Sequence, residues 1–314
     1  MTPSEGPGRR LPDFFIVGHH KSGTTALYEM LRRHPEIFMP SLKEPRFFDA
    51  DLHAFSRTPQ NTGRPQTLDE YLDLFAGASA NQRWGEASPS YLRSAVAAGA
   101  IAQVAPAARS IAILREPASF VRSLHSQMVQ EHVETEQDLR RAFEREQIDR
   151  DGRRVRRYSD HIHYTEQLRR FHEAFPREQV LVLIYDDFRT DNEGTVRKTL
   201  RFLGVDEHAP VEALEVNPSV SVRSVRLDRA VRSLYSSRSP AARAAKAAVR
   251  TLTPGRFHRG ALPAIRKRLV YAEQAQPDEQ LMAELRARYA GEVAAVSEYL
   301  GRDLVAEWGY EGLV

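Results

Sequence analysis

The 314-residue sequence contains no cysteine. Disulfide bonds, thiolate nucleophiles and zinc–sulfur sites are therefore excluded. Long apolar runs are missing as well: no stretch approaches the roughly 18 apolar residues of a membrane span, and none follows the basic start as in a signal peptide. By elimination, these absences favour a cytoplasmic protein.

The formal net charge of +3 is distributed unevenly along the chain. Residues 222–268 contain 13 lysines and arginines against one acid, Asp228, a local net charge of +12. The rest of the chain is about −9 by the same count. Such local basic character predicts contact with a specific anionic surface or acceptor, peripheral membrane contact included, rather than nucleic-acid binding. We expect this stretch to be a basic helical arm or acceptor lid rather than a second domain.

Short apolar runs alternate with helical patterns. The chain therefore predicts an α/β fold: a single P-loop-like domain over 11–314, with a central parallel sheet flanked by helices, after a disordered lead-in over 1–10. A surface loop is expected over 50–67. Strands are expected over 14–17, 84–87, 111–114 and 180–184, and helices up to His34, over 95–104, from Pro117, over 159–174, over 193–203 and up to Gly301.

The most informative segment is FFIVGHHKSGTTAL, residues 14–27, in which an apolar strand leads through a glycine loop into a helix. A Walker A loop has the spacing G-x-x-x-x-G-K-[ST]. Gly18 and Gly23 keep the glycine spacing, but Thr24 occupies the lysine position and the lysine lies upstream, at Lys21. After a strand and before an amphipathic helix, this loop favours phosphate binding over a solvated turn.

Two further clusters of polar side chains stand out. One follows the end of the strand 111–114, and the other precedes the loop 50–67. Arg115 follows the strand 111–114, and Ser123 lies about two turns into the next helix, so that a guanidinium and a hydroxyl can hold a second phosphate. A Walker-type enzyme needs a strand ending in aspartate to hold magnesium, whereas this strand ends in arginine. Glu44, between Lys43 and Arg46, is a candidate general base or a solvated ion pair.

Together these clusters resemble the PAPS-dependent sulfotransferases, most closely the bacterial and heparan-sulfate-type branch. KSGTTAL (21–27) is similar to the loop that this family wraps around the 5′-phosphosulfate, and EPRFFD (44–49) resembles the run that carries its catalytic base. GEASPSY (85–91) resembles another recurrent segment, and GRDL (301–304) matches more loosely; the similarity covers about residues 13–205. The resemblance implies that Lys21 and Glu44 are catalytic, that no metal is used, and that PAPS, released as PAP, is bound by Lys21, Ser22, Gly23, Thr24, Thr25, Ala26, Arg115 and Ser123.

This sequence departs from the family pattern in two places. The glycosaminoglycan enzymes usually carry a lysine where this chain has Ala87, so that one active-site cation is missing or is replaced by Lys43. The C-terminal cofactor loop has only a weak candidate, residues 256–260. His125 and His163 remain alternative bases.

The resemblance implies sulfuryl transfer to a hydroxyl of a small natural product, a saccharide or a lipid, as in a bacterial tailoring enzyme. Two alternatives stay open. One is a P-loop kinase that uses ATP and magnesium, although the lysine expected after Gly23 is absent. The other is a non-catalytic binder of anionic surfaces that uses the basic arm, in which residues 241–249 form a candidate amphipathic helix.

Overall fold

The structure, a computed structural model, describes residues 10–53, 63–131, 133–145, 147–148, 154–155, 158–210, 220–222, 271–273 and 278–314. The chain divides into two compact units, the first formed by Met1–Phe120, Ser159–Asn217 and Leu285–Val314, the second by Val121–Tyr158 and Pro218–Glu284. The single domain over 11–314 stays a prediction. The lead-in before Arg10 and the basic arm beyond Val222 lie outside the described residues.

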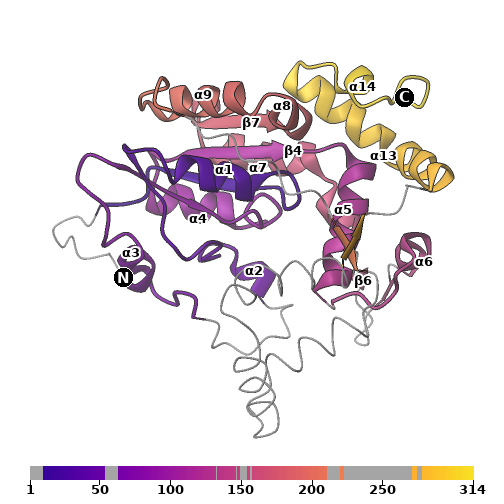
Figure 1. Ribbon diagram of the computed structural model, residues 1–314, viewed down its shortest axis with the longest axis horizontal. Helices are drawn as coiled ribbons and strands as arrows, with labels where there is room; N and C mark the ends of the chain where they lie inside the picture. The colour runs from indigo at the N-terminus through magenta and orange to yellow at the C-terminus, as the bar shows by residue number, and fades with distance from the viewer. Residues whose placement is uncertain are drawn as a thin grey trace, which may run out of the picture. The chain divides into compact units, whose positions relative to one another are not determined.

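A five-stranded parallel sheet with the order β2-β3-β1-β4-β7 forms the centre of the first unit (Figure 1). β1 lies between β3 and β4, with Ile16 in register with Ala87 on one side and Ile111 on the other. All five residues of β1 are buried, as expected for a strand covered on both faces. The strands are β1 (Phe14–Gly18), β2 (Ile37–Phe38), β3 (Arg83–Ala87), β4 (Arg109–Leu114) and β7 (Val180–Ile184).

Helices surround this sheet in the first unit (Figure 1). Two others, α5 (Pro117–Gln130) and α13 (Glu279–Leu300), run from one unit into the other. The helices of the first unit are α1 (Thr24–Leu31), α2 (Ala50–His53), α3 (Leu68–Asp73), α4 (Ala97–Val104), α7 (Tyr164–Ala174), α8 (Tyr185–Thr190), α9 (Asn192–Leu203) and α14 (Leu304–Glu307), with 3₁₀ turns at Ser159–His161 and Arg177–Gln179.

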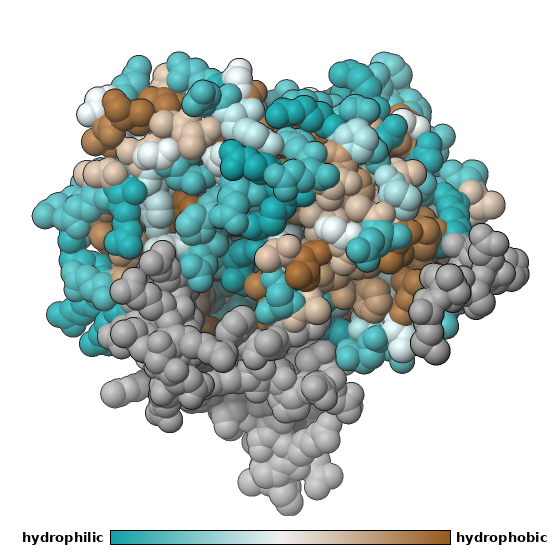
Figure 2. Space-filling view, turned by 180° about the vertical axis from the view of Figure 1, so that it is seen from behind, coloured by the Kyte–Doolittle hydropathy of each residue, from teal (hydrophilic) through white to brown (hydrophobic). Residues whose placement is uncertain are grey.

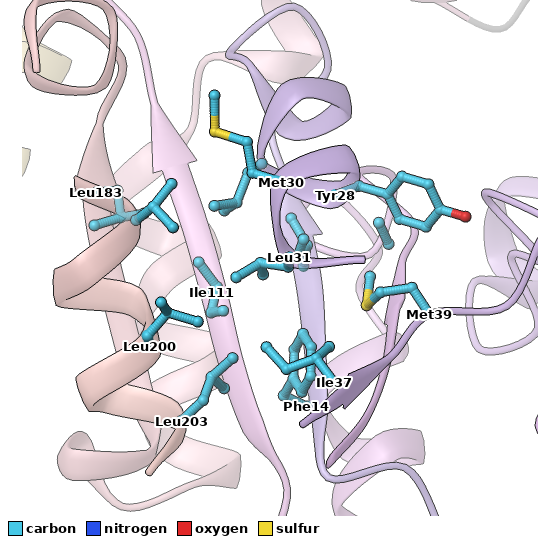
Figure 3. Close-up of a cluster of buried hydrophobic side chains, with 14 of the residues drawn as sticks. Phe14, Tyr28, Met30, Leu31, Ile37, Met39, Ile111, Leu183, Leu200 and Leu203 are labelled. Carbon is cyan, nitrogen blue, oxygen red and sulfur yellow. The ribbon is translucent and has the colours of Figure 1, made fainter. Parts of the chain in front are cut away.

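One face of the sheet is covered by α1 and α9 (Figure 3). Leu31 of α1 and Leu200 of α9 belong to the same apolar cluster as Ile111 of β4, and all three are at most 1 % exposed. Because side chains alternate along a strand, Phe15 of β1 points to the other face, where its ring meets those of Phe48 and Tyr91. The segments around Phe48 and Tyr91 are thereby anchored to β1.

The second unit contains the rest of α5, the helix α6 (Leu139–Glu144) and two short antiparallel pairs. The first pair joins β5 (Gln147–Ile148) to β6 (Arg154–Val155), and the second joins β8 (Val220–Val222) to β9 (Tyr271–Glu273). Arg140 of α6 forms ion pairs with Asp278 and with Glu284 at the start of α13.

The predicted α/β fold with a central parallel sheet is confirmed, and all four predicted strands are present. Two predictions were wrong in detail. The loop expected over 50–67 begins with a short helix, α2, whose Asp51 carboxylate accepts a hydrogen bond from Ser94 Oγ at 2.6 Å. The helix expected over 159–174 starts only at Tyr164, because residues 159–161 form a separate turn closed by the Ile162 N–H on the Ser159 carbonyl.

Hydrophilic side chains cover much of one face of the described part, interrupted by separate apolar patches (Figure 2). Among the helices whose residues are described, none combines the length and apolarity needed to cross a bilayer.

Candidate active site

The loop between β1 and α1 turns at Gly23, which caps α1 with a left-handed backbone (φ 87°). A side chain there would also collide with Phe188, whose ring lies 2.9 Å from the position of an added Cβ. Glycine alone meets both conditions without strain. The turn brings the first N–H groups of α1 to the carboxyl edge of the sheet, an arrangement that attracts anions.

Lys21 lies in the same loop and has a left-handed backbone of its own, with φ 59°. Within the described residues, two other non-glycine residues share this conformation, Glu44 (φ 59°) and Arg46 (φ 55°). Such a backbone costs about 1–3 kcal/mol and persists where the surroundings enforce it, which is frequent at active sites. Both residues predicted to be catalytic are thus among the strained positions.

Arg115 joins the end of β4 to the Lys21 loop. Its Nη1 donates to the Lys21 carbonyl at 2.8 Å, and its guanidinium lies 4.5 Å from the ring centroid of Tyr185. Its own carbonyl accepts from the Tyr164 hydroxyl at 2.9 Å. The Arg115 Nε is buried and has no hydrogen-bond partner among the described residues, so one donor of this guanidinium remains for a ligand.

The residue after Arg115 fixes the start of α5. The Glu116 carboxylate accepts from the N–H groups of Ala118 (2.9 Å) and Ser119 (2.6 Å) and from the Tyr310 hydroxyl (2.6 Å). The C-terminal segment therefore braces the β4–α5 junction, which the sequence pattern did not indicate. The sequence analysis missed the contacts that Tyr164, Tyr185 and Tyr310 make with Arg115 and Glu116. These tyrosines are distant from their partners in sequence, and nothing in the local sequence marks such a contact.

Glu44 lies beside the carboxyl end of β3. Its N–H donates to the Ala87 carbonyl at 3.0 Å, and its Oε1 lies 2.6 Å from Lys43 Nζ. The predicted ion pair with Lys43 is therefore present, while the Glu44 side chain keeps 30 % of its surface exposed. A carboxylate with a cation on one side and solvent on the other can still accept a proton from an incoming hydroxyl.

Burial raises the pKa of the Glu44 carboxyl. His20, Lys43 and Arg46 together lower it by more than burial raises it, so that the pKa lies below its ordinary value. Glu44 is therefore ionised at pH 7. Burial lowers the pKa of His20 to about 4, despite the opposing effect of Glu44, and His20 is neutral at that pH. The cations beside Glu44 at neutral pH are thus Lys43 and Arg46.

Two more histidines lie close to His20 in the loop region. His19 is fully buried, and its Nε2 lies 2.6 Å from Gln167 Oε1; because Gln167 donates its amide to the His161 carbonyl, His19 is the donor. Burial lowers the pKa of His19 to about 3 and that of His161 well below its ordinary value. All three histidines are neutral at pH 7, so they shape this region without adding charge.

The other predicted site residues are placed as follows. Ser22 and Thr24 are buried, Thr25 is exposed and Ala26 is half-buried at the start of α1. Ser123 is buried on α5 within the second unit. The candidate cofactor loop over 256–260 lies outside the described residues.

Neither alternative base gains support from its surroundings. His125 is buried, its Nε2 is hydrogen-bonded with the Glu136 carbonyl at 2.9 Å, and burial lowers its pKa, which fits a structural role. His163 is exposed at the start of α7 and makes no capping hydrogen bond there. Within the described residues, no group of three or more histidine, aspartate or glutamate side chains is arranged to hold a metal ion.

We compared the chain with protein families and with known proteins. A model of the sulfotransferase family matches residues 12–209. The human bifunctional heparan sulfate N-deacetylase/N-sulfotransferase 3 is 29 % identical over 210 residues, 63 % of this chain and 23 % of that protein. Human heparan sulfate glucosamine 3-O-sulfotransferase 6 is 32 % identical over 125 residues, 40 % of this chain and 33 % of that protein. The chain thus matches a third or less of the length of these curated relatives.

A solved structure extends the likeness to almost the whole chain. The crystal structure of a sulfotransferase from Alicyclobacillus acidocaldarius is 25 % identical, covers 96 % of this chain and 99 % of its own, and superposes with a TM-score of 0.68. The likeness therefore includes the parallel sheet and the segments that follow its strands.

Proposed function

The chain belongs to the sulfotransferase family, and from that premise we propose that it transfers the sulfuryl group of PAPS to a hydroxyl of an acceptor, giving PAP and a sulfate ester. The observation that carries the proposal is the 2.8 Å hydrogen bond from Arg115 Nη1 to the Lys21 carbonyl. It joins the two segments predicted to bind the two phosphate-bearing ends of a single adenylate donor.

The residues present suit such a donor. The turn at Gly23 directs the N–H groups of α1 to the edge of the sheet, and Lys21 adds a cation in the same loop. The unpartnered Nε of Arg115 supports an additional anionic contact from the next strand along. We assign the 5′-phosphosulfate to the loop 21–26 and the 3′-phosphate to Arg115, and the same role for Ser123 stays a prediction from the sequence.

In the proposed reaction, Glu44 accepts the proton of the acceptor hydroxyl as its oxygen bonds to sulfur. The bond between sulfur and the 5′-phosphate oxygen breaks at the same time, and Lys21 with the loop N–H groups stabilises the charge that develops on this oxygen. Lys21 can then supply a proton to it. The step uses no divalent ion, because a sulfuryl group carries less negative charge than a phosphoryl group.

Lys43 takes the place of the family lysine that is missing at Ala87. The Glu44 N–H bonds to the Ala87 carbonyl, so position 87 is adjacent to the proposed base, and the Lys43 ammonium lies 2.6 Å from that base. A cation is therefore available near Glu44 from the neighbouring position in the chain.

The acceptor is proposed only by chemical class: a hydroxyl of a saccharide, a lipid or a small natural product. Two relatives are named for heparan sulfate, a saccharide, so oligosaccharides belong in the first screen. Incubation with PAPS and candidate acceptors, followed by mass spectrometry, is expected to show products heavier by one SO₃ group.

Thermal shift distinguishes the proposal from its two rivals. PAP without magnesium is expected to raise the melting temperature, because ligands that bind only the native state stabilise it. Selective stabilisation by ATP with magnesium would favour the kinase instead. Stabilisation by neither nucleotide, together with salt-sensitive pelleting on anionic liposomes, would favour the non-catalytic binder.

A further inference from the structure

Glu86 is a fully buried acid near the proposed base. It lies at the carboxyl end of β3 and is 0 % exposed. Its Oε2 accepts from Ser88 Oγ at 2.9 Å, and its Oε1 lies 3.5 Å from the Tyr71 hydroxyl; the Tyr91 hydroxyl is hydrogen-bonded to the same carboxyl group. Three hydroxyl groups thus converge on one carboxyl, which takes no part in the proposed reaction.

Two of these hydroxyl groups continue into the segment 44–48. Ser88 Oγ accepts from the Arg46 N–H at 3.0 Å, and the Tyr91 hydroxyl accepts from the N–H groups of Phe47 (2.9 Å) and Phe48 (3.4 Å). With the Glu44 N–H on the Ala87 carbonyl, every backbone N–H between 44 and 48 is bonded to residues 87–91, since Pro45 has none.

The segment needs this support because its backbone is strained. Glu44 and Arg46 are both left-handed, a conformation that favours glycine, and they flank a proline. Strain of this kind persists only where the surroundings enforce it. Hydroxyl groups can accept from the backbone only when their own protons point elsewhere, and Glu86 is the acceptor toward which the Ser88 proton points.

We propose that Glu86 is a positioning residue for Glu44, which it fixes through the hydroxyl groups of Ser88 and Tyr91 and the backbone N–H groups of segment 44–48. The catalytic consequence rests on the proposed role of Glu44 as the base, whereas the ordering of the segment does not.

The protonation state of Glu86 fits this role. Burial raises its pKa to about 8; the hydroxyl groups of Tyr91, Ser88 and Tyr71 oppose that rise, and Asp49 reinforces it. At pH 7 the group is a neutral carboxylic acid, with one donor and one acceptor side. Glutamine has nearly the same shape and also presents one acceptor side and one donor side, so Glu86→Gln is the conservative variant that cannot ionise.

Tyr91→Phe tests the ordering of the segment, with Tyr71→Phe as its matched control. Both tyrosines are fully buried and both hydroxyls approach Glu86, but only the Tyr91 hydroxyl accepts from the segment. Amide hydrogen exchange of peptides covering 44–48 is expected to rise about tenfold in Tyr91→Phe and to stay unchanged in Tyr71→Phe. Equal exchange in the two variants overturns the inference, whatever the enzyme's activity.

Kinetics then connect this ordering to the reaction. Tyr91→Phe is expected to lower kcat about 10–100-fold, since small displacements of a reacting group are costly, with PAP affinity and the KM for PAPS changed less than about twofold. A loss of PAP affinity equal to the loss in kcat would mean a general structural defect and would overturn the positioning role. Failure of the wild type to bind PAP or transfer sulfate would instead refute the proposed function.

The pH profile provides a readout that a purely structural role would not change. Wild-type kcat is expected to fall above pH 8, as Glu86 ionises among Asp49, Tyr71 and Tyr91. Glu86→Gln is expected to keep kcat at pH 7 within about threefold and to lose this fall, because it cannot ionise. An identical decline in the wild type and the glutamine variant contradicts the proposal.

Discussion

The two strained segments of the candidate site, around Lys21 and around Glu44, are held in different ways. The Lys21 loop is fixed largely by its own sequence: a buried strand leads in, Gly23 permits the turn, and α1 begins at once. The Glu44 segment has no glycine and no helix of its own, and its N–H groups are bonded to residues 87–91. A local motif thus specifies the first segment, and tertiary contacts specify the second.

This difference predicts where substitutions act. Changes in the Lys21 loop should affect the donor and its leaving group, whereas changes in or behind segment 44–48 should affect the acceptor proton with little effect on donor binding. Five experiments, given in order of decreasing expected effect, test this difference between the two segments.

Glu44→Gln is expected to have the largest effect. Removal of the base should lower kcat about 10³-fold, within the range for general-base catalysis. PAP affinity, measured by calorimetry, should stay within about twofold because Glu44 lies outside the donor loop. A variant that transfers sulfate nearly as fast as the wild type would mean that another group is the base.

Lys21→Ala is expected to lower kcat about 10²–10³-fold, as for the loss of one group that stabilises developing charge. The control is Lys198→Ala on α9, an exposed lysine whose loss should leave turnover unchanged. Circular dichroism should show both variants folded. Near-normal turnover of Lys21→Ala would remove the loop from the reaction.

Arg115→Ala should act mainly on binding. Loss of charge-assisted hydrogen bonds to a phosphate and of the bond to the Lys21 carbonyl should weaken PAP about 10–100-fold by calorimetry. Arg189→Ala on α8, an exposed arginine, is the control. Unchanged PAP affinity in Arg115→Ala would exclude this residue from the donor site.

Gly23→Ala tests the local origin of the loop geometry. The left-handed backbone and the 2.9 Å approach to Phe188 both oppose a methyl group, so unfolding free energy should fall by about 1–3 kcal/mol in urea titrations. Gly291→Ala within α13, where an added Cβ meets nothing within 4 Å, should not destabilise the protein. Equal stability of the two variants would show that the turn tolerates a side chain.

The pH dependence of stability should show the smallest effect. His19 and His20, with pKa values near 3 and 4, are neutral when buried but take up protons when unfolded, so their contribution is full above pH 6.5 and is lost as pH falls. Glu86, with a pKa of about 8, behaves oppositely: its contribution is full below pH 4.5 and is lost as pH rises toward 8.

The difference between wild type and Glu86→Gln isolates the second contribution. From pH 6.5 to 8, the wild type should lose up to about 1.4 kcal/mol per pH unit relative to the glutamine variant. Parallel curves in urea titrations would mean that Glu86 is already ionised in the folded protein.

Much of the fold was predictable because its signals are local. Apolar runs marked β1, β3, β4 and β7. The helix expected over 193–203 matches α9 to within one residue, and Gly204 caps its end with a φ of 70°. β2 was missed because two residues carry no periodicity, and α2 because four residues inside a polar stretch resemble a loop. Elements this short form because of contacts with residues distant in sequence, and those contacts exist only in the folded protein.

The site divides along the same line. Lys21, Glu44 and Arg115 were recognisable from their order and spacing, and these assignments remain predictions. Neither the roles of Ser88 and Tyr91 as acceptors nor the bond between Arg115 and Lys21 could be read from spacing, because partners separated by some 40 to 90 residues are joined only by the sheet. Glu86 lies inside the segment 85–91, which the sequence singled out, but nothing in that segment indicates that Glu86 is buried or which hydroxyl groups surround it.

The sequence by itself determined the parallel sheet, the glycine turn into α1 and the residue types at the strand ends, because strand burial, backbone freedom and side-chain charge are properties of short stretches. Only the tertiary structure decided which hydrogen bonds hold segment 44–48, which protonation state Glu86 adopts and which carbonyl Arg115 contacts. Those outcomes depend on burial and on distances between residues remote in sequence. The strand order β3-β1-β4 brings these residues together.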